Sequence, residues 1–186
     1  EAEALVAEVE AGFVAARDAH PEFEGASGAV ATPYEGIFVY GPQDVRGRFL
    51  SDLGIEMPAE LAEQLGEEFG GQLSLERVDL LDLDVVVWLD VPAETDDIET
   101  SAYGAYGALA VHTEGREVFL DSEAADALGG AMSFVTVLSL PYLLDAVVPM
   151  IGTYRIRSHK AFMVVSWGQQ QAQPGQRDPG SSWTEF

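Results

Sequence analysis

The opening segment of the chain has the apolar spacing of an amphipathic helix. Apolar residues from Leu5 to Ala16 recur at steps of three and four among alanine and glutamate, which places them on one face of a helix. The pair His20-Pro21 follows, and proline disfavours helix in the residue before it. The pattern therefore predicts a helix over residues 2–19.

Three short apolar segments are predicted to be strands. They are residues 28–32, 84–89 and 117–121. The middle segment is an uninterrupted run of Val, Trp and Leu that follows Asp84, a pattern typical of a strand buried on both faces of a parallel sheet.

Helical patterns fill most of the intervals between these strands. Gly54 offers the φ freedom that a helix C-cap needs, and Ser74 is an expected N-cap. The predicted helices are 46–53, 59–69, 75–81, 102–110, 122–128 and 135–151, and the predicted loops are 33–44 and 90–100. Because helices and strands alternate, we predict an α/β fold with a mostly parallel sheet.

Charge and composition change near residue 150. Residues 1–150 hold 30 acids and 5 bases, whereas residues 151–186 hold 2 acids and 4 bases. The net charge of −23 argues against nucleic acid and against docking on anionic lipid through basic residues. Residues 166–186, rich in Gln, Pro and Gly, are predicted to form a loosely ordered extension. The predicted division is therefore 1–20, a helix; 21–152, an α/β lobe; and 153–186, an atypical tail.

The chain shows no recognisable catalytic motif. It has no Cys, no GxSxG elbow, no GxxxxGK[ST] phosphate loop and no HExxH zinc motif. His20, His112 and His159 are far apart in the sequence. The acid pairs 82/84 and 96–97 offer carboxylates for cation binding, but such pairs on so acidic a chain are typical of solvated acids. We expect no enzyme activity, no catalytic residue, no metal site and no intrinsic cofactor.

Residues 33–48 form the strongest candidate for ligand binding. They follow a predicted strand and lead into a predicted helix, which is where open α/β sheets bind ligands. Aromatic rings offer flat apolar walls, and guanidinium groups bind carboxylate, hydroxamate or catecholate oxygens. The candidate residues are Tyr34, Phe38, Tyr40, Arg46 and Arg48.

The two arginines are expected to point in different directions. Side chains two residues apart on a helix do not share a face. We expect Arg48 to face the ligand, close to Tyr40, and Arg46 to pair with an acid. The alternative is that both arginines pair with local acids, such as Asp44 and Asp52, and that the aromatic residues are core.

Three stretches of the sequence resemble one family of proteins. They are residues 40–50 followed by 52–54, residues 73–88, and residues 118–121 together with 133–134 and 138–145. They resemble the C-terminal lobe of the class III (cluster A-I) substrate-binding proteins of iron–siderophore ABC transporters. The second stretch is the most specific, because the family repeats a Ser-x-Glu-x-x-x-x-Leu-x-Asp-type pattern before a buried strand.

This resemblance implies a three-layer Rossmann-like lobe with helices on both faces of its sheet. Residues 2–19 would then be the end of a helix joining two lobes, and the N-terminal lobe would be absent. Such proteins hold a ferric siderophore in a cleft between the lobes and dock on a permease through acidic residues. The implied ligand-binding residues are Tyr34, Phe38, Tyr40, Arg46, Arg48, Ser133 and Phe134, with 129–134 as a cleft-facing loop, and the implied docking residue is Glu76.

The resemblance also implies partners and a location. The partners would be a ferric siderophore, which carries the only iron involved, an ABC permease and the N-terminal lobe. The parent protein would be extracytoplasmic, either lipid-anchored or periplasmic, although no signal peptide is visible and apolar stretches of about ten residues are too short to span a bilayer. Two other classes stay open, a binding or interaction module without transport and an α/β enzyme with an unrecognised site.

Overall fold

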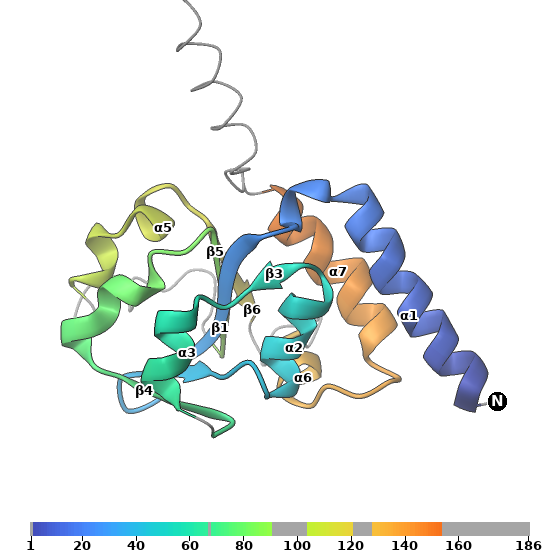
Figure 1. The fold of residues 1–186 in the computed structure, drawn as a ribbon, viewed down its shortest axis with the longest axis horizontal. Helices are drawn as coiled ribbons and strands as arrows, with labels where there is room; N and C mark the ends of the chain where they lie inside the picture. The colour runs from blue at the N-terminus through green and yellow to red at the C-terminus, as the bar shows by residue number, and fades with distance from the viewer. Residues whose placement is uncertain (1, 67, 91–103, 121–127, 154–186) are drawn as a thin grey trace, which may run out of the picture.

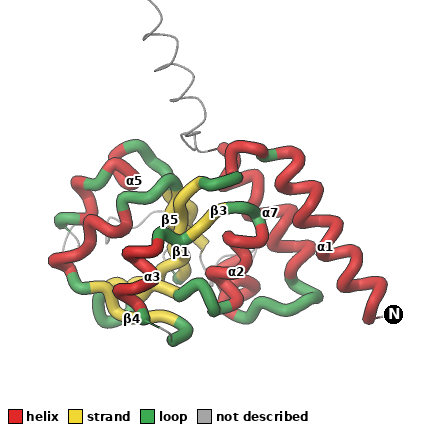
Figure 2. Tube along the Cα trace, viewed as in Figure 1, coloured by secondary structure: helices red, strands yellow, loops and turns green. Residues whose placement is uncertain are grey.

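The computed structural model describes residues 2–66, 68–90, 104–120 and 128–153. One open, mixed sheet lies between helices on both of its faces (Figures 1 and 2). The strands are β1 (Ala26–Pro33), β2 (Ile37–Tyr40), β3 (Ile55–Glu56), β4 (Gly70–Leu73), β5 (Val85–Leu89) and β6 (Glu117–Leu120). The predicted α/β class is confirmed.

The parallel part of the sheet contains the strands predicted from sequence. The strand order is β4-β2-β1-β5-β6, and β3 pairs with the start of β1. β1, β5 and β6 run parallel, with Val30 opposite Val87 and Val87 opposite Val118. β2 is antiparallel to both β1 and β4. The predicted strand 84–89 therefore lies between two parallel neighbours, and every residue of β5 is buried.

Alternation along β5 divides the core into two layers. Successive side chains of a strand point to opposite faces, so Val85, Val87 and Leu89 pack in one cluster, and Val86 and Trp88 pack in another. The first cluster includes α1 (Ala2–Ala19), α2 (Val45–Asp52), α6 (Leu128–Ser133) and α7 (Leu140–Thr153). The second includes α3 (Ala59–Leu65), the 3-10 helices η2 (Leu75–Leu81) and η3 (Tyr106–Ala108), and α5 (Ala110–Thr113). These layers are the predicted three-layer arrangement.

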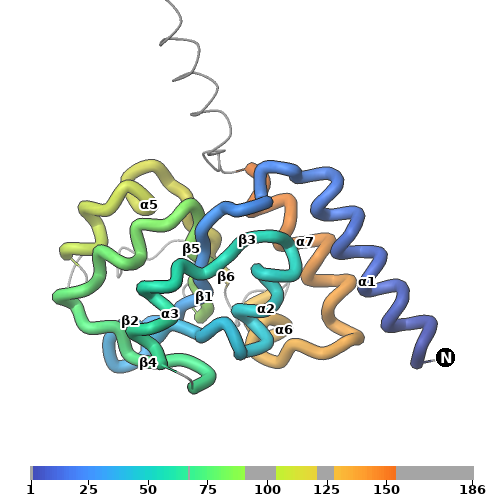
Figure 3. Tube along the Cα trace, viewed as in Figure 1, coloured from blue at the N-terminus to red at the C-terminus, as the bar shows by residue number. Residues whose placement is uncertain are grey.

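The first and last described helices lie side by side, although they are far apart in the sequence (Figure 3). A Cβ atom added at Gly12 of α1 would lie 2.8 Å from Leu144 Cδ1 of α7, so the small residue permits this close approach. The short helix η1 (Pro21–Phe23) follows α1, as the predicted helix end at His20-Pro21 requires. No described helix is both long and apolar enough to cross a membrane.

The prediction of a loop over residues 33–44 was wrong, because these residues contain β2. Glu35 and Gly36 have φ values of +49° and +122°, and this tight turn folds β2 back on β1. Ile37 and Val39 are fully buried, so their alternation with Phe38 and Tyr40 follows the period of a strand.

The predicted helix 59–69 ends early, at Leu65. Gly66 adopts a φ of +77°, which ends α3. The chain then forms β4, whose approach to β2 needs a glycine, because a Cβ at Gly70 would lie 2.5 Å from the Val39 carbonyl oxygen. The pairing of β4 with β2 therefore determines the conformation of this segment.

The later helices also differ from the prediction. Residues 129–134, expected to be a loop, belong mostly to α6, and the helix expected over 135–151 begins at Leu140. Thr136 and Ser139 exchange backbone–side-chain hydrogen bonds of 2.9 and 3.2 Å just before α7, which satisfies backbone donors at the helix start.

The remaining differences concern helix continuity and range. The described part of 102–110 contains η3 and only the first residue of α5, and extended backbone at Leu109 separates the two helices. The predicted 75–81 helix is the 3-10 helix η2, kinked at Arg77. The expectations for 90–100 (beyond Asp90), 122–127 and 154–186 fall outside the described residues.

Candidate ligand-binding surface

The carboxyl ends of the parallel strands lie at one edge of the sheet. β1 ends at Pro33, β5 at Leu89 and β6 at Leu120. Figure 1 places the turn after β1, the start of α2 and the segment after α6 along this same edge. We call the turn 34–36, residues 44–48 and residues 133–138 the carboxyl-edge surface. Open α/β sheets bind ligands at such an edge.

Three aromatic rings gather beside the start of α2. Phe38 and Tyr40 share one face of β2, and their ring centroids lie 5.2 Å apart. Phe69, next to β4, places its ring 5.6 Å from that of Phe38 and is 58% exposed. Sequence reasoning missed Phe69, because the residue was assigned to a helix. The available signal was a large apolar residue directly before Gly70-Gly71.

Arg46 contacts this aromatic cluster and pairs with Asp44. Its guanidinium donates to both carboxylate oxygens of Asp44, at 2.6 and 2.8 Å, and lies over the Tyr40 ring with Cζ 3.8 Å from the centroid. Asp44 also caps α2 by accepting from the Arg46 backbone N–H at 2.9 Å. The predicted pairing of Arg46 with an acid is confirmed.

These contacts change how the three groups ionise. Hydrogen bonding of the Arg46 guanidinium to the Asp44 carboxylate is the main reason that the pKa of Arg46 is raised. Burial opposes ionisation of Asp44, but hydrogen bonds from Arg46 and its charge hold the Asp44 pKa below the usual value. Burial raises the pKa of Tyr40, the nearby Arg46 charge opposes this, and the carboxylates of Asp90 and Asp44 add to the rise.

Arg48 does not share the direction of Arg46, as the two-residue spacing between them predicts. It is exposed, and among the described residues it forms no ion pair. It borders a surface hollow of about 240 Å³ that is also lined by Phe13, Asp52 and residues 135–137. The expectation that Arg48 lies close to Tyr40 was wrong, since the guanidinium of Arg46 lies over the Tyr40 ring.

The other predicted ligand residues lie along the same edge. Tyr34 is 62% exposed, and its carbonyl accepts a 2.7 Å hydrogen bond from Gln72. Phe134 is 80% exposed directly after Ser133, the last residue of α6. The structure thus brings Phe38, Tyr40 and Arg46 into contact, and spreads Tyr34, Arg48, Ser133 and Phe134 along the edge. Exposed apolar side chains gathered on one surface are typical of binding sites.

Glu76, the docking residue that the family resemblance implies, lies on the surface. It is exposed at the second position of η2, and its backbone N–H donates to Ser74 Oγ at 3.3 Å. Ser74 is therefore the predicted N-cap. The docking role of Glu76 stays a prediction.

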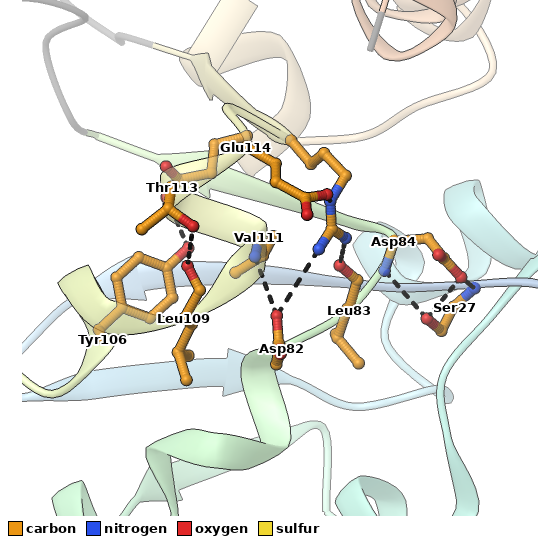
Figure 4. Close-up of polar contacts among 11 residues, drawn as sticks. Ser27, Asp82, Leu83, Asp84, Tyr106, Leu109, Val111, Thr113 and Glu114 are labelled. Atoms are coloured by element: carbon orange, nitrogen blue, oxygen red, sulfur yellow. Dashed lines mark hydrogen bonds and ion pairs between the residues drawn. The ribbon is translucent and has the colours of Figure 1, made fainter. Parts of the chain in front are cut away.

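The acid pair Asp82 and Asp84, considered from sequence for cation binding, instead holds the fold together (Figure 4). Asp84 accepts from the Ser27 backbone N–H and hydroxyl, at 2.9 and 2.8 Å, and so links β5 to β1. Asp82 accepts from the Val111 N–H at 2.9 Å. Within the described ranges, no group of three His, Asp or Glu side chains is arranged to hold a metal ion.

A buried polar cluster lies on the face opposite the aromatic cluster. Glu117 accepts hydrogen bonds from Trp88 Nε1 at 2.9 Å and from the Tyr106 hydroxyl at 2.5 Å. Its second oxygen lies 2.8 Å from His112 Nδ1. Trp88 and Tyr106 are fully buried. These bonds use both oxygens of the carboxylate within the core, which indicates a structural role.

Comparisons with known proteins find matches among solved structures and not among sequences. No protein-family model and no curated protein matches the sequence. Solved structures do match. PiaA of Streptococcus pneumoniae TIGR4, solved with ferrichrome, is 18% identical with a TM-score of 0.66, and the alignment covers 82% of this chain and 52% of PiaA. FhuD2 of Staphylococcus aureus with bound ferrioxamine B is 14% identical with a TM-score of 0.65, covering 82% and 58%.

A third solved structure matches as well. A periplasmic solute-binding protein of Mycobacterium smegmatis is 24% identical with a TM-score of 0.64, covering 82% of this chain and 50% of that protein. The chain therefore spans about half the length of the solved structures that it matches. At these identities the likeness establishes the fold, which fits the C-terminal lobe of FhuD-like binding proteins.

Proposed function

We propose that this chain is the C-terminal lobe of a solute-binding protein that captures a ferric siderophore and delivers it to an ABC importer. One observation carries the proposal: a half-buried cluster of aromatic rings and an arginine lies at the carboxyl edge of a lobe whose fold is shared with ferrichrome- and ferrioxamine-bound proteins. In this proposal the protein binds and releases its cargo without chemical change.

The carboxyl-edge surface and the aromatic cluster beside it would together form one wall of the ligand site. The rings of Phe38, Tyr40 and Phe69 offer apolar contact to the organic frame of a siderophore. Arg48 has an exposed guanidinium that can donate to the iron-binding oxygens. Arg46 is committed to Asp44 and holds Tyr40 in place. Tyr34, Ser133 and Phe134 extend the wall.

A second lobe would supply the opposite wall. One wall buries only part of a ligand, so the chain alone is expected to bind more weakly than a two-lobe protein. Glu76 would then meet a cationic residue of the permease. The parent protein would work outside the cytoplasm, held by a lipid anchor or free in a periplasm.

The test is a fluorescence titration of this chain, alone and joined to an N-terminal lobe, with ferrichrome and ferrioxamine B. Saturable quenching that is tighter in the two-lobe protein supports the proposal. In that protein, Arg48→Ala should weaken binding roughly 10- to 150-fold, the effect of losing a hydrogen bond to a charged group. Arg77→Ala, on the opposite layer, is the matched control and should bind as the parent does.

Absence of saturable quenching in both proteins would refute the proposal. The remaining interpretation would then be a binding or interaction module without transport. If binding survives both Arg46→Ala and Arg48→Ala within about twofold, charge does not hold the ligand, and the aromatic cluster carries the affinity.

A further inference from the structure

The turn between β1 and β2 has a backbone conformation that costs free energy to hold. Glu35 has a φ of +49° and Gly36 a φ of +122°, and a positive φ is unfavourable for a residue that has a side chain. Such a conformation persists only where neighbouring groups hold it in place. The turn also carries Tyr34, which is 62% exposed and extends the proposed ligand wall.

A side chain of the edge strand β4 holds this turn. Gln72 Nε2 donates to the Tyr34 carbonyl oxygen at 2.7 Å, although the two residues are 38 positions apart in the sequence. The Oε1 atom of the same amide lies against Gly36, because a Cβ atom added at Gly36 would be 3.4 Å from it. One side-chain amide therefore contacts both ends of the turn.

The same glutamine lies beside the aromatic cluster. β4 pairs with β2 so that Gln72 is directly opposite Phe38, and side chains opposite each other on neighbouring strands lie on one face of a sheet. The ring of Phe38 lies 5.2 Å from that of Tyr40 and 5.6 Å from that of Phe69. Gln72 thus joins the turn that carries Tyr34 to the aromatic cluster.

The pairing of the strands does not depend on this amide. Gln72 is exposed at the penultimate position of β4, and the backbone of β4 pairs with β2 over residues 70–73. Exposed side chains outside the core usually contribute little to stability. What the Gln72 amide determines is therefore the position of the turn and of the tyrosine that the turn carries.

We infer that Gln72 is a positioning residue of the ligand wall: its amide fixes the turn 34–36 and so sets where the Tyr34 ring lies relative to Phe38 and Tyr40. A segment that is already ordered loses less conformational entropy when a ligand binds. The amide should therefore raise affinity without touching the ligand. This role rests on the proposed function and adds a residue to the same site.

Two variants at position 72 separate the amide donor from the shape of the side chain. Gln72→Met keeps the length of the side chain and removes both polar atoms, and Gln72→Glu keeps the planar end but has no N–H donor at neutral pH. Relaxation of ¹⁵N in the 186-residue chain without ligand measures the order of the Glu35 and Gly36 amides. Both variants should make these amides more mobile. Unchanged order in both variants would overturn the inference.

Affinity for ferrichrome tests the effect on the proposed site. In a fluorescence titration of this chain, alone and joined to an N-terminal lobe, Gln72→Met should weaken ferrichrome binding roughly 3- to 10-fold, the cost of ordering one more side chain on binding. Gln64→Met, at an exposed glutamine on α3, is the matched control. It should change neither the order of the turn nor the affinity.

A double-mutant cycle with Tyr34 separates positioning of the ring from a general structural role. Tyr34→Ala removes the ring and keeps the backbone carbonyl that Gln72 bonds. If Gln72 acts through the ring, adding Gln72→Met to Tyr34→Ala should weaken binding no further, within about twofold. Losses that multiply in the double variant would overturn the inference, because Gln72 would then act elsewhere in the lobe.

The titration also distinguishes failure of the inference from failure of the proposed function. If the parent binds ferrichrome and Gln72→Met binds it equally well, the inference fails and the proposed function stands. If ferrichrome binds neither to this chain nor to the two-lobe protein, the proposed function fails, and the inference fails with it.

Discussion

The guanidinium of Arg46 lies on the ring of Tyr40, with its Cζ atom 3.8 Å from the ring centroid. The same guanidinium is held by both carboxylate oxygens of Asp44. A strand, a helix cap and the first turn of a helix are therefore locked together at the edge where we propose that the ligand binds. A fixed aromatic wall costs less ordering entropy on binding than a mobile one.

Arg46→Ala should lower the free energy of unfolding by about 1–3 kcal/mol, because it leaves the largely buried Asp44 carboxylate without its charged partner. The side chains of Asp44 and Arg46 are 9% and 16% exposed. Urea unfolding of the full chain measures the change. Arg77→Ala is the matched control: its pair with Glu60 is much more exposed, so its loss should cost less than about 1 kcal/mol. Equal losses for both variants would contradict the argument.

The Asp44 carboxylate should make part of the stability dependent on pH. The pKa of Asp44 is lowered in the folded state, so its contribution is present above the unfolded-state pKa of about 3.9 and is lost as the pH falls through the folded-state pKa. Asp44→Asn keeps a good N-cap and removes the charge. The difference in unfolding free energy between parent and variant should therefore be largest near neutral pH and shrink below about pH 4. A constant difference across that range would exclude a role for the charge.

Tyr106→Phe should destabilise the fold through the buried Glu117. The variant removes the 2.5 Å hydrogen bond to that carboxylate, at a cost of about 1–3 kcal/mol. Burial and then the charge of Glu117 raise the pKa of Tyr106. Its contribution is therefore present below the unfolded-state pKa of about 10 and is lost as the pH rises above that value.

Urea unfolding at neutral and at alkaline pH, followed by tryptophan fluorescence, tests both parts of the Tyr106 prediction. The difference between parent and Tyr106→Phe should shrink at high pH. Tyr34→Phe, at an exposed tyrosine, should stay within about 0.5 kcal/mol of the parent. A neutral effect of Tyr106→Phe would show that Glu117 does not need this donor.

The same substitution should have opposite effects at two helical glycines. A Cβ at Gly47 of α2 would lie 2.3 Å from the Gly41 carbonyl oxygen, so Gly47→Ala should destabilise by more than about 1 kcal/mol despite its better helix propensity. At Gly130 of α6, no described atom lies within 4 Å of the added Cβ. Gly130→Ala should therefore stabilise by about 0.5–1 kcal/mol. Thermal unfolding followed by circular dichroism compares the two, and a shared sign would refute the packing argument.

Glu76→Arg tests the proposed docking role in a two-lobe parent. Because Glu76 is exposed at the start of η2, the change should leave the fold and siderophore affinity intact while it abolishes permease-dependent uptake. Glu60→Arg, an exposed acid at the first turn of α3, is a control expected to retain uptake. Unchanged uptake in Glu76→Arg would remove this residue from docking.

Two features follow from local sequence patterns, the parallel core and the separation of the two arginines. An unbroken apolar run over Val85–Leu89 leaves no polar face for solvent, so it predicts a strand buried on both sides. The period of a helix alone requires Arg46 and Arg48 to diverge. Local patterns suffice in both cases, because neighbours along the chain set the geometry.

The neighbours of β2, Phe69 and Arg48 depend instead on tertiary contacts. β2 is a strand because the turn at Glu35-Gly36 folds it onto β1, and the glycine- and proline-rich composition of 33–44 conceals its four-residue alternation. Phe69 joins Phe38 because β4 pairs with β2. Arg48 faces residues 135–137, which lie almost ninety positions further along the chain. Contacts between such distant segments are made by strand pairing and helix packing, and no periodicity in the sequence encodes them.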